Sequence, residues 1–177
     1  MELTEKTVQK NYVYRGKIIS VRADDALRAD GKPCKRELVE HPGAACVLYS
    51  EDGKILLVKQ YRYAYGKTIY EIPAGKLNEG EEPALAAARE LEEEAGIRAD
   101  SLTLLFTMYP TPGYTNEKIY IYRADIGTHT SAHSDEGEFL TAEFLPEETV
   151  RRMLESGEIN DGKTIIALQA YFLSSKD

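Results

Sequence analysis

Residues 75–97 read GKLNEGEEPALAAARELEEEAGI and form the most informative segment of the sequence. Alanine and leucine dominate its middle, Pro83 suits a first helical turn, and Gly96 is a natural helix stop. The sequence therefore predicts a helix over about 82–95, preceded by a polar loop that contains glycine.

The second half of this predicted helix concentrates negative charge. Four of five consecutive positions carry a carboxylate, with Arg89 as the cation beside them: Glu90, Glu92, Glu93 and Glu94. At about 100° per residue, Glu90, Glu93 and Glu94 share one face, and Glu92 is incidental. Arg89 precedes Glu93 by four positions, so the two can pair. The same geometry predicts an opposite face that packs into the core, formed by Leu85, Ala88, Leu91 and Ala95.

Two interpretations of this acidic cluster are open. A solvated face is one, because like-charged neighbours on a helix cost only a few tenths of a kcal/mol each. A divalent metal site is the other, because Mg2+ binds a few carboxylates together with the phosphate oxygens of a substrate. The residues of the helix alone do not decide between them.

The composition is that of an ordinary globular protein, with 177 residues, 42% hydrophobic residues and a net charge of -8. The negative charge argues against non-specific binding to nucleic acid, which requires a basic face. Cys34 and Cys46 do not suggest a disulfide framework, and they predict reduced thiols in a cytoplasmic protein. The N-terminus lacks the apolar segment of a signal peptide, and no apolar run reaches the length of a membrane span.

The order of the remaining elements favours an α+β fold with mixed sheets. The turn ADGK, residues 29–32, predicts a hairpin within residues 11–41, and EDG, residues 51–53, predicts a second one. Further strands are predicted at 68–72 and near 102–109, 117–125 and 139–145, with a polar loop at 127–138 and helices at 146–157 and 160–174.

The spacing within residues 75–97 resembles the Nudix box. Gly75 is followed after five residues by Glu81, and after seven more by RELEEEAGI, which begins at Arg89. The resemblance implies a Nudix-type α/β/α sandwich with mixed sheets over residues 42–177. It also implies an N-terminal antiparallel sheet over residues 1–41, which forms a dimer. The implied reaction is hydrolysis of a diphosphate joined to a nucleoside, with Mg2+ or Mn2+ as cofactor.

The positions that match the box imply individual roles. The implied metal ligands are Glu90, Glu94 and the carbonyl of Ala74. Arg89 matches the residue that orients the carboxylates, Glu93 lies beside the ligands, and Glu81 gives outer support.

Residues after the box bear on which diphosphate is cleaved. Pro112 lies sixteen residues after Gly96, which resembles the ADP-ribose pyrophosphatase subgroup. Tyr114 instead resembles the dinucleoside polyphosphate subgroup, and a Pro-Gly pair is also a common turn. The proline is favoured because the rest of the chain agrees with it. The implied products are AMP and ribose 5-phosphate, and the alternatives are other nucleoside diphosphate sugars such as GDP-mannose, or dinucleoside polyphosphates. A binding module without activity is disfavoured because every box carboxylate is present.

Segments such as YRGKIISV and NDGKTIIALQ also resemble bacterial ADP-ribose pyrophosphatases, which implies a homodimer. The implied adenine pocket comprises Arg36, Glu37 and Arg62, covered by Ile18 or Ile19 of a second copy. Tyr61 or Tyr63 can stack on the base instead, with packing in the sheet as the alternative. Glu117 matches a position near the terminal ribose, and a charge at a strand edge is its alternative.

Two loops complete the predictions. In HSDEGEF, the resemblance implies that Glu136, with Glu138 second, helps to activate water, and a solvated acidic loop is the alternative. Residues 157–164, GEINDGKT, satisfy the phosphate-loop pattern. Because a helix precedes them, they are predicted to form a turn between helices, with Asn160 or Asp161 capping the last one.

Overall fold

The computed structural model describes residues 3–133 and 139–174. The chain divides into two compact units, which are described separately below. Unit 1 comprises Met1–Gly43 and Tyr109–Lys118, and unit 2 comprises Ala44–Met108 and Ile119–Asp177.

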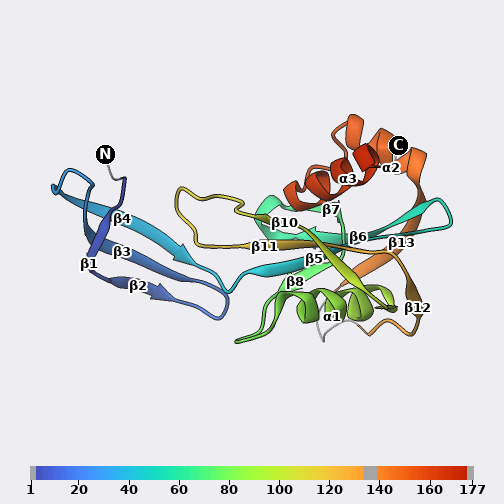
Figure 1. Ribbon diagram of the computed structural model, residues 1–177, viewed down its shortest axis with the longest axis horizontal. Helices are drawn as coiled ribbons and strands as arrows, with labels where there is room; N and C mark the ends of the chain where they lie inside the picture. Colours follow the sequence, from blue (N-terminus) through green and yellow to red (C-terminus); the bar gives the residue numbers. More distant parts are fainter. Residues whose placement is uncertain (1–2, 134–138, 175–177) are drawn as a thin grey trace. The chain divides into compact units, whose positions relative to one another are not determined.

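The helices and strands are labelled in Figure 1. Unit 1 holds the strands β1 (Lys6–Gln9), β2 (Tyr12–Arg15), β3 (Ser20–Leu27) and β4 (Pro33–Glu40). The strands of unit 2 are β5 (Ala44–Glu51), β6 (Lys54–Arg62), β7 (Lys67–Glu71), β8 (Ala74–Lys76), β9 (Ile97–Ala99), β10 (Leu102–Met108), β11 (Ile119–Ala124), β12 (Gly127–His129) and β13 (Leu140–Pro146). Its helices are α1 (Pro83–Ala95), α2 (Glu147–Glu155) and α3 (Gly162–Ser174), with a short 3-10 helix η1 (Tyr63–Tyr65).

Unit 1 contains an antiparallel sheet in which β3 pairs with β1, β2 and β4. The hairpin predicted around ADGK is confirmed as β3 and β4, and the Gly31 N–H donates to the Arg28 carbonyl across the turn at 2.8 Å. Strand β1 was not predicted from the sequence. All four of its residues are exposed, so no buried apolar side chain marks it as a strand.

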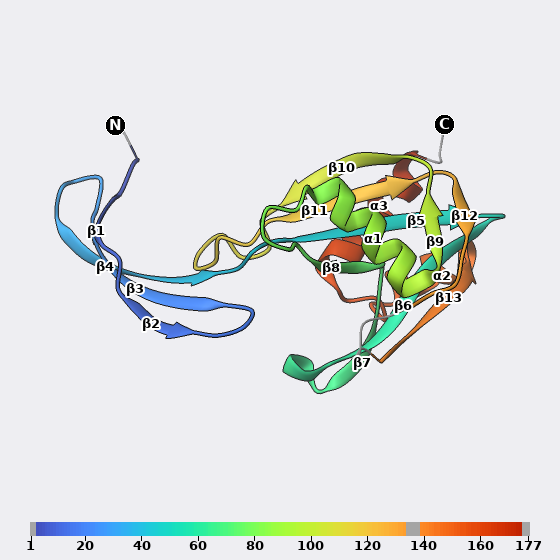
Figure 2. The same cartoon turned by 90° about the horizontal axis from the view of Figure 1, so that it is seen from below.

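Unit 2 is built around a sheet with the order β10-β11-β5-β6-β13, in which β7 pairs with β6 and β8 with β5. The β5–β11 pair is parallel and the β10–β11 pair antiparallel, so the sheet is mixed. Side chains alternate along β5: Cys46 and Leu48 pack in the cluster with α2 and α3, and Val47 packs with α1. The sheet therefore separates α1 from the other two helices (Figure 1), and Figure 2 views the face that α1 covers.

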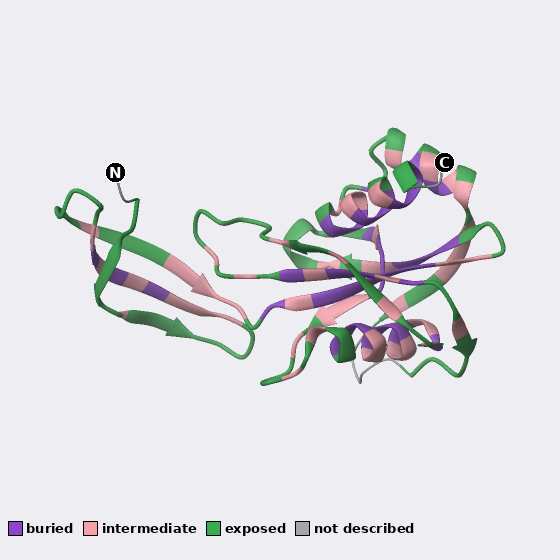
Figure 3. Cartoon of the chain, viewed as in Figure 1, coloured by how far each residue is buried: buried purple, intermediate pink, exposed green. Residues whose placement is uncertain are grey.

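This arrangement confirms the predicted α+β fold, an α/β/α sandwich. The middle of β5 and of β11 is buried between the helices (Figure 3). Both predicted C-terminal helices are present as α2 and α3. Each helix in the described part of the chain is too short or too polar to cross a membrane.

Two short strand pairings lie where the sequence suggested loops. Strand β8 pairs with β5, and β12 pairs antiparallel with β9. Each of β8, β9 and β12 spans only three residues. Such short segments show too few alternations of apolar and polar residues for a strand to be predicted.

Gly96 ends α1 in the left-handed conformation, with a φ of 65°, and its N–H donates to the Glu92 carbonyl at 2.9 Å. An added Cβ would lie 2.7 Å from the backbone oxygen of Thr130 and 2.8 Å from the backbone nitrogen of Ala132. Gly80 has a similar φ of 72°, but a Cβ there would have nothing within 4 Å.

Gly96→Ala is therefore expected to lower the free energy of unfolding more than Gly80→Ala does. The left-handed conformation alone costs a non-glycine residue about 1–2 kcal/mol. Crowding of the added Cβ against the backbone at Gly96 is expected to add about 1–3 kcal/mol. Urea denaturation of both variants measures the difference. Equal losses of the free energy of unfolding in the two variants would show that residues 130–132 shift to accommodate the added Cβ at no energetic cost.

Candidate active site

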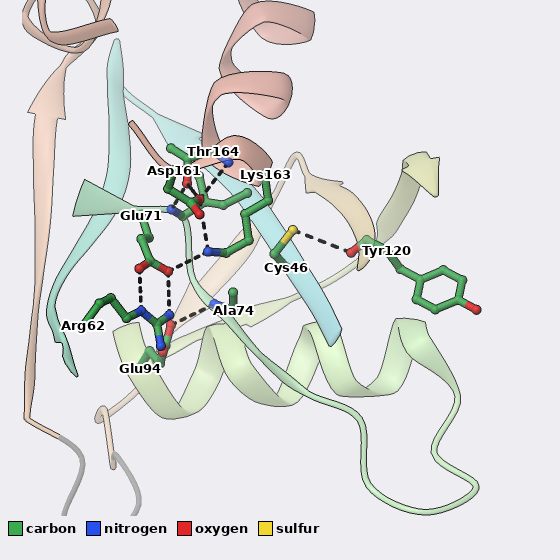
Figure 4. Close-up of polar contacts among 10 residues, drawn as sticks. Cys46, Arg62, Glu71, Ala74, Glu94, Tyr120, Asp161, Lys163 and Thr164 are labelled. Carbon is green, nitrogen blue, oxygen red and sulfur yellow. Dashed lines mark hydrogen bonds and ion pairs between the residues drawn. The ribbon is translucent and has the colours of Figure 1, made fainter. Parts of the chain in front are cut away.

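The backbone of β8 meets the acidic end of α1. The Ala74 N–H donates a hydrogen bond of 3.0 Å to Oε2 of Glu94 (Figure 4). On the other side of this segment, the Val47 N–H donates to the Pro73 carbonyl at 2.9 Å. Glu94 is therefore fixed beside the residue whose carbonyl was predicted to face a metal.

Gly75 leaves the space that the Glu90 carboxylate occupies. A Cβ built on Gly75 would lie 1.9 Å from Oε1 of Glu90, far inside van der Waals contact. The position thus requires glycine because of this close approach and not because of its φ, which is not positive. Gly75 of the box and the Glu90 carboxylate therefore fit together as one feature.

The faces of α1 differ from those predicted. Leu85 was expected in the core but is 66% exposed, whereas Glu90 and Glu94 are buried, at 8% and 3% exposure. Small side chains, Ala86 and Ala87, pack on the sheet in place of Leu85. The hydrophobic periodicity predicted that the carboxylates of the helix are exposed. Hydrogen bonds from Arg89 to Glu90 and from the Ala74 N–H to Glu94 instead compensate the cost of burying these two carboxylates. The solvated-face interpretation is therefore wrong for Glu90 and Glu94.

Arg89 connects three carboxylates. Its Nη1 lies 2.6 Å from Oε1 of Glu90 and 2.8 Å from Oε2 of Glu93, and its Nε lies 2.9 Å from Oε1 of Glu81. The predicted pairing of Arg89 with Glu93 is confirmed. The hydrogen bond to Glu81 is the main cause of the raised pKa of Arg89, and the same bond lowers the pKa of Glu81. These contacts keep the guanidinium charged and direct the carboxylates of the helix.

A second charged cluster, which the sequence analysis did not identify, lies at the end of β7 (Figure 4). The buried Glu71 accepts hydrogen bonds of 2.6 Å from Nε and from Nη2 of Arg62, and one of 2.6 Å from Nζ of Lys163. Burial opposes ionisation of Glu71, but the Arg62 hydrogen bond and the Lys163 charge outweigh it and lower its pKa. Lys163 also contacts Asp161 at 3.0 Å.

One sequence signal could have indicated this cluster. Lys163 is the second residue of α3, where the positive end of the helix dipole disfavours a cation. Of the two residues predicted to cap α3, Asn160 and Asp161, it is Asp161 whose Oδ2 accepts from the Thr164 N–H, at 3.0 Å. The phosphate-loop pattern is a turn between α2 and α3, as predicted.

The donors around Glu90 and Glu94 fit a hard divalent cation. Two buried carboxylates next to a backbone carbonyl supply oxygen ligands, and Mg2+ commonly takes its remaining ligands from water and phosphate. The described residues contain no group of three or more His, Cys, Asp or Glu side chains that would enclose an ion by themselves. The space left by Gly75 is the specific feature that admits the Glu90 carboxylate.

Most of the residues predicted to bind substrate belong to unit 1. Arg36 pairs with Glu5, with Nε 2.8 Å from Oε2. Glu37 lines a cavity of about 210 Å3 whose other walls include Val21 and Tyr114. These contacts leave the predicted roles of Arg36 and Glu37 as predictions.

The roles predicted for the other substrate residues also stay predictions. Pro112 is exposed in a turn, and Glu117 has its Oε1 3.4 Å from Nδ1 of His41. In unit 2, Arg62 is partly exposed and holds Glu71. Glu136 and Glu138 lie outside the described residues.

Two tyrosines had an alternative prediction as sheet packing. Tyr61 and Tyr63 are 57% and 91% exposed, so neither packs inside the sheet. Their rings remain candidates for stacking on a base.

Comparison with known proteins places this site in a class. A model of the NUDIX domain matches residues 39–168, and a model of the nucleoside diphosphate sugar hydrolase N-terminal domain matches residues 5–39. The chain therefore belongs to the NUDIX domain family, which confirms the predicted resemblance.

Individual relatives are similar over nearly the whole chain. An ADP-ribose pyrophosphatase of Bacillus subtilis (strain 168) is 41% identical, over 94% of this chain and 92% of that protein. A methanol dehydrogenase activator of Bacillus methanolicus is 37% identical, over 93% of this chain and 91% of that protein. A crystal structure of an ADP compounds hydrolase matches with a TM-score of 0.84 at 23% identity, covering 99% of this chain and 98% of that one, which supports the fold.

Proposed function

We propose that this enzyme hydrolyses ADP-ribose to AMP and ribose 5-phosphate in a reaction that requires Mg2+, with Mn2+ as an alternative. The observation that carries the proposal is the burial of Glu90 and Glu94 against the backbone of Ala74 and Gly75. The similarity to the Bacillus subtilis ADP-ribose pyrophosphatase supports this substrate.

The proposed metal ligands are Glu90, Glu94 and the Ala74 carbonyl. A divalent cation bound there would neutralise the negative charge of the diphosphate and would lower the pKa of a water molecule that it binds. Arg89 holds Glu90 and Glu93 in place, and the Ala74 N–H holds Glu94. The buried position limits access of bulk water to these carboxylates, which strengthens their attraction for a cation.

The remaining roles are proposed from the sequence. Glu136, with Glu138 second, accepts the proton of the attacking water, which requires hydrogen-bond reach of that water. Contacts with adenine are assigned to Arg36, Glu37 and Arg62, and a contact with the terminal ribose is assigned to Glu117. Pro112 is assigned to a turn that faces the substrate.

We also propose that residues 1–41 form the dimerisation region and residues 42–177 the catalytic domain of a cytoplasmic homodimer. Apolar side chains exposed on the strands of unit 1 support a partner there; they are Val8, Tyr12, Val13 and Tyr14. Cys34 and Cys46 are free thiols, as expected in a reducing compartment. Light scattering during gel filtration is expected to give twice the mass of the 19.9 kDa chain.

Turnover of three substrates tests the function. With Mg2+, we expect ADP-ribose to give AMP and ribose 5-phosphate with a kcat/KM at least about tenfold above that on GDP-mannose or diadenosine polyphosphates, a difference of about 1.4 kcal/mol. Chromatography of the products measures each rate. A higher kcat/KM on GDP-mannose or on a diadenosine polyphosphate would replace the substrate assignment, and nucleotide binding without turnover would indicate a binding module.

A further inference from the structure

The start of α3 carries three polar side chains: Asp161 directly before the helix, and Lys163 and Thr164 in its first turn. Lys163 and Thr164 are both buried, at 8% and 0% exposure. Oδ2 of Asp161 accepts hydrogen bonds from the Thr164 N–H at 3.0 Å, from the Thr164 hydroxyl at 2.6 Å and from Lys163 Nζ at 3.0 Å. Asp161 therefore caps the helix and also orders the two side chains that follow it.

These side chains hold the strand that leads into the candidate metal site. Nζ of Lys163 donates to Oε2 of Glu71 at 2.6 Å, and the Thr164 hydroxyl oxygen accepts from the Ile72 N–H at 3.0 Å. Both contacts join residues 92 positions apart in the chain. In Figure 4, Lys163 and Thr164 lie on the side of α3, and the Ala74–Glu94 hydrogen bond lies on the side of α1.

The segment 71–74 is consequently fixed at every residue. The Glu71 side chain and the Ile72 N–H are held by α3, the Pro73 carbonyl by the Val47 N–H, and the Ala74 N–H by Glu94. With every one of these groups engaged, the four residues that join β7 to β8 have little freedom to shift. The direction of the Ala74 carbonyl is set by this segment.

The chemistry of the cluster favours positioning over stability. Glu71 and Asp161 are balanced by Arg62 and Lys163, so the cluster has no net charge. Burial favours the neutral amine of Lys163, but the adjacent Asp161 and Glu71 carboxylates raise its pKa, which keeps it charged. Apolar replacements of buried ion pairs are often neutral or stabilising, so stability alone does not account for such a cluster.

We infer that Asp161, Lys163 and Thr164 are positioning residues for the metal site: through Glu71 and Ile72 they fix the segment 71–74 and hence the Ala74 backbone beside Glu94. This inference rests on the proposed function only in taking Ala74, Glu90 and Glu94 as the metal site. Outer partners of metal ligands typically contribute 10–100-fold in metal affinity or activity.

Thr164→Val tests the inference because valine keeps the shape of threonine and removes the acceptor for the Ile72 N–H. We expect the affinity for Mn2+, measured without substrate from the electron paramagnetic resonance signal of free Mn2+, to fall about tenfold. We expect kcat with Mg2+ to fall by a similar factor with a smaller change in KM. Thr164→Ser restores the hydroxyl and is expected to recover both values.

Tyr171→Phe is the matched control, since it removes a hydroxyl of α3 that donates to Glu147 at 2.7 Å, whereas the Thr164 hydroxyl oxygen accepts from the Ile72 N–H. Its Mn2+ affinity is expected to equal that of the wild type. If Thr164→Val binds Mn2+ as Tyr171→Phe does, the inference is wrong. If Thr164→Val does not fold, Lys163→Met provides the same test of Mn2+ affinity. It removes the Lys163 contact with Glu71, while Arg62 still pairs with that buried carboxylate.

The Mn2+ measurement also separates this inference from the proposed function. Suppose that the wild type binds Mn2+ but does not cleave ADP-ribose, and that Thr164→Val binds Mn2+ with tenfold lower affinity. The positioning role would then stand, and the substrate assignment would be wrong. A wild type that does not bind Mn2+ would overturn the inference itself.

Discussion

Glu94→Gln is expected to lower kcat/KM on ADP-ribose at least about a thousandfold while the protein remains folded. The amide oxygen of glutamine can still accept the hydrogen bond from the Ala74 N–H, which is 3.0 Å long in the native protein. The negative charge is lost, and with it an anionic metal ligand. Stabilisation of the transition state by a bound metal amounts to several kcal/mol, and about 4 kcal/mol corresponds to a factor of about a thousand.

Glu92→Gln is the matched control for this variant. It makes the same change of charge on the same helix, at the position that the helical geometry assigns to no role. Wild-type kcat/KM is expected for Glu92→Gln, and urea denaturation of both variants checks that the fold is retained. A Glu94→Gln enzyme with near wild-type turnover and Mn2+ affinity would exclude Glu94 as a metal ligand.

The sequence predicted those parts of the fold that local spacing determines. Helix α1 was placed to within one residue because proline, alanine and glycine mark its start, middle and end. The hairpins β3–β4 and β5–β6 followed from their turn residues. The box spacing identified the family, since it specifies residue types at fixed distances along 75–97.

Contacts between distant residues could not be predicted in the same way. Burial of Glu94 depends on an N–H at Ala74, twenty positions earlier, and burial of Glu90 depends on the missing side chain of Gly75. Hydrophobic periodicity treats every carboxylate as exposed, and so it placed Leu85 in the core instead. The predicted set of ligands did not depend on this error, because it came from the box positions.

The cluster at the end of β7 shows the same limit more strongly. Glu71 lies in a strand that was predicted, and Asp161 was predicted as a cap, yet no local pattern connects them. Their connection runs through Lys163, whose hydrogen bond to Glu71 spans 92 positions of the chain. Only the packing of α3 on the sheet brings these charges together.

Gly75→Ala is expected to lower kcat/KM about a hundredfold with little loss of stability. The added Cβ would meet Oε1 of Glu90 at 1.9 Å, so the carboxylate must move away from the backbone of Ala74 and Gly75. That carboxylate is the far end of a flexible side chain, so it can move at low cost to the fold. A displacement of about 1 Å at a reacting centre can cost about a hundredfold in rate. Steady-state kinetics and Mn2+ binding measure the loss.

A double-mutant cycle with Glu90→Gln shows whether Gly75→Ala acts through Glu90. If the alanine works by displacing the carboxylate, the charge is already absent in Glu90→Gln, and Gly75→Ala should add less than about threefold there. Residues in contact give such non-additive effects, whereas independent sites give losses that multiply. A full hundredfold further loss in the Glu90→Gln background would mean that Gly75 acts on the backbone of β8 or on substrate, and that the close approach to Glu90 is not the reason for glycine at this position.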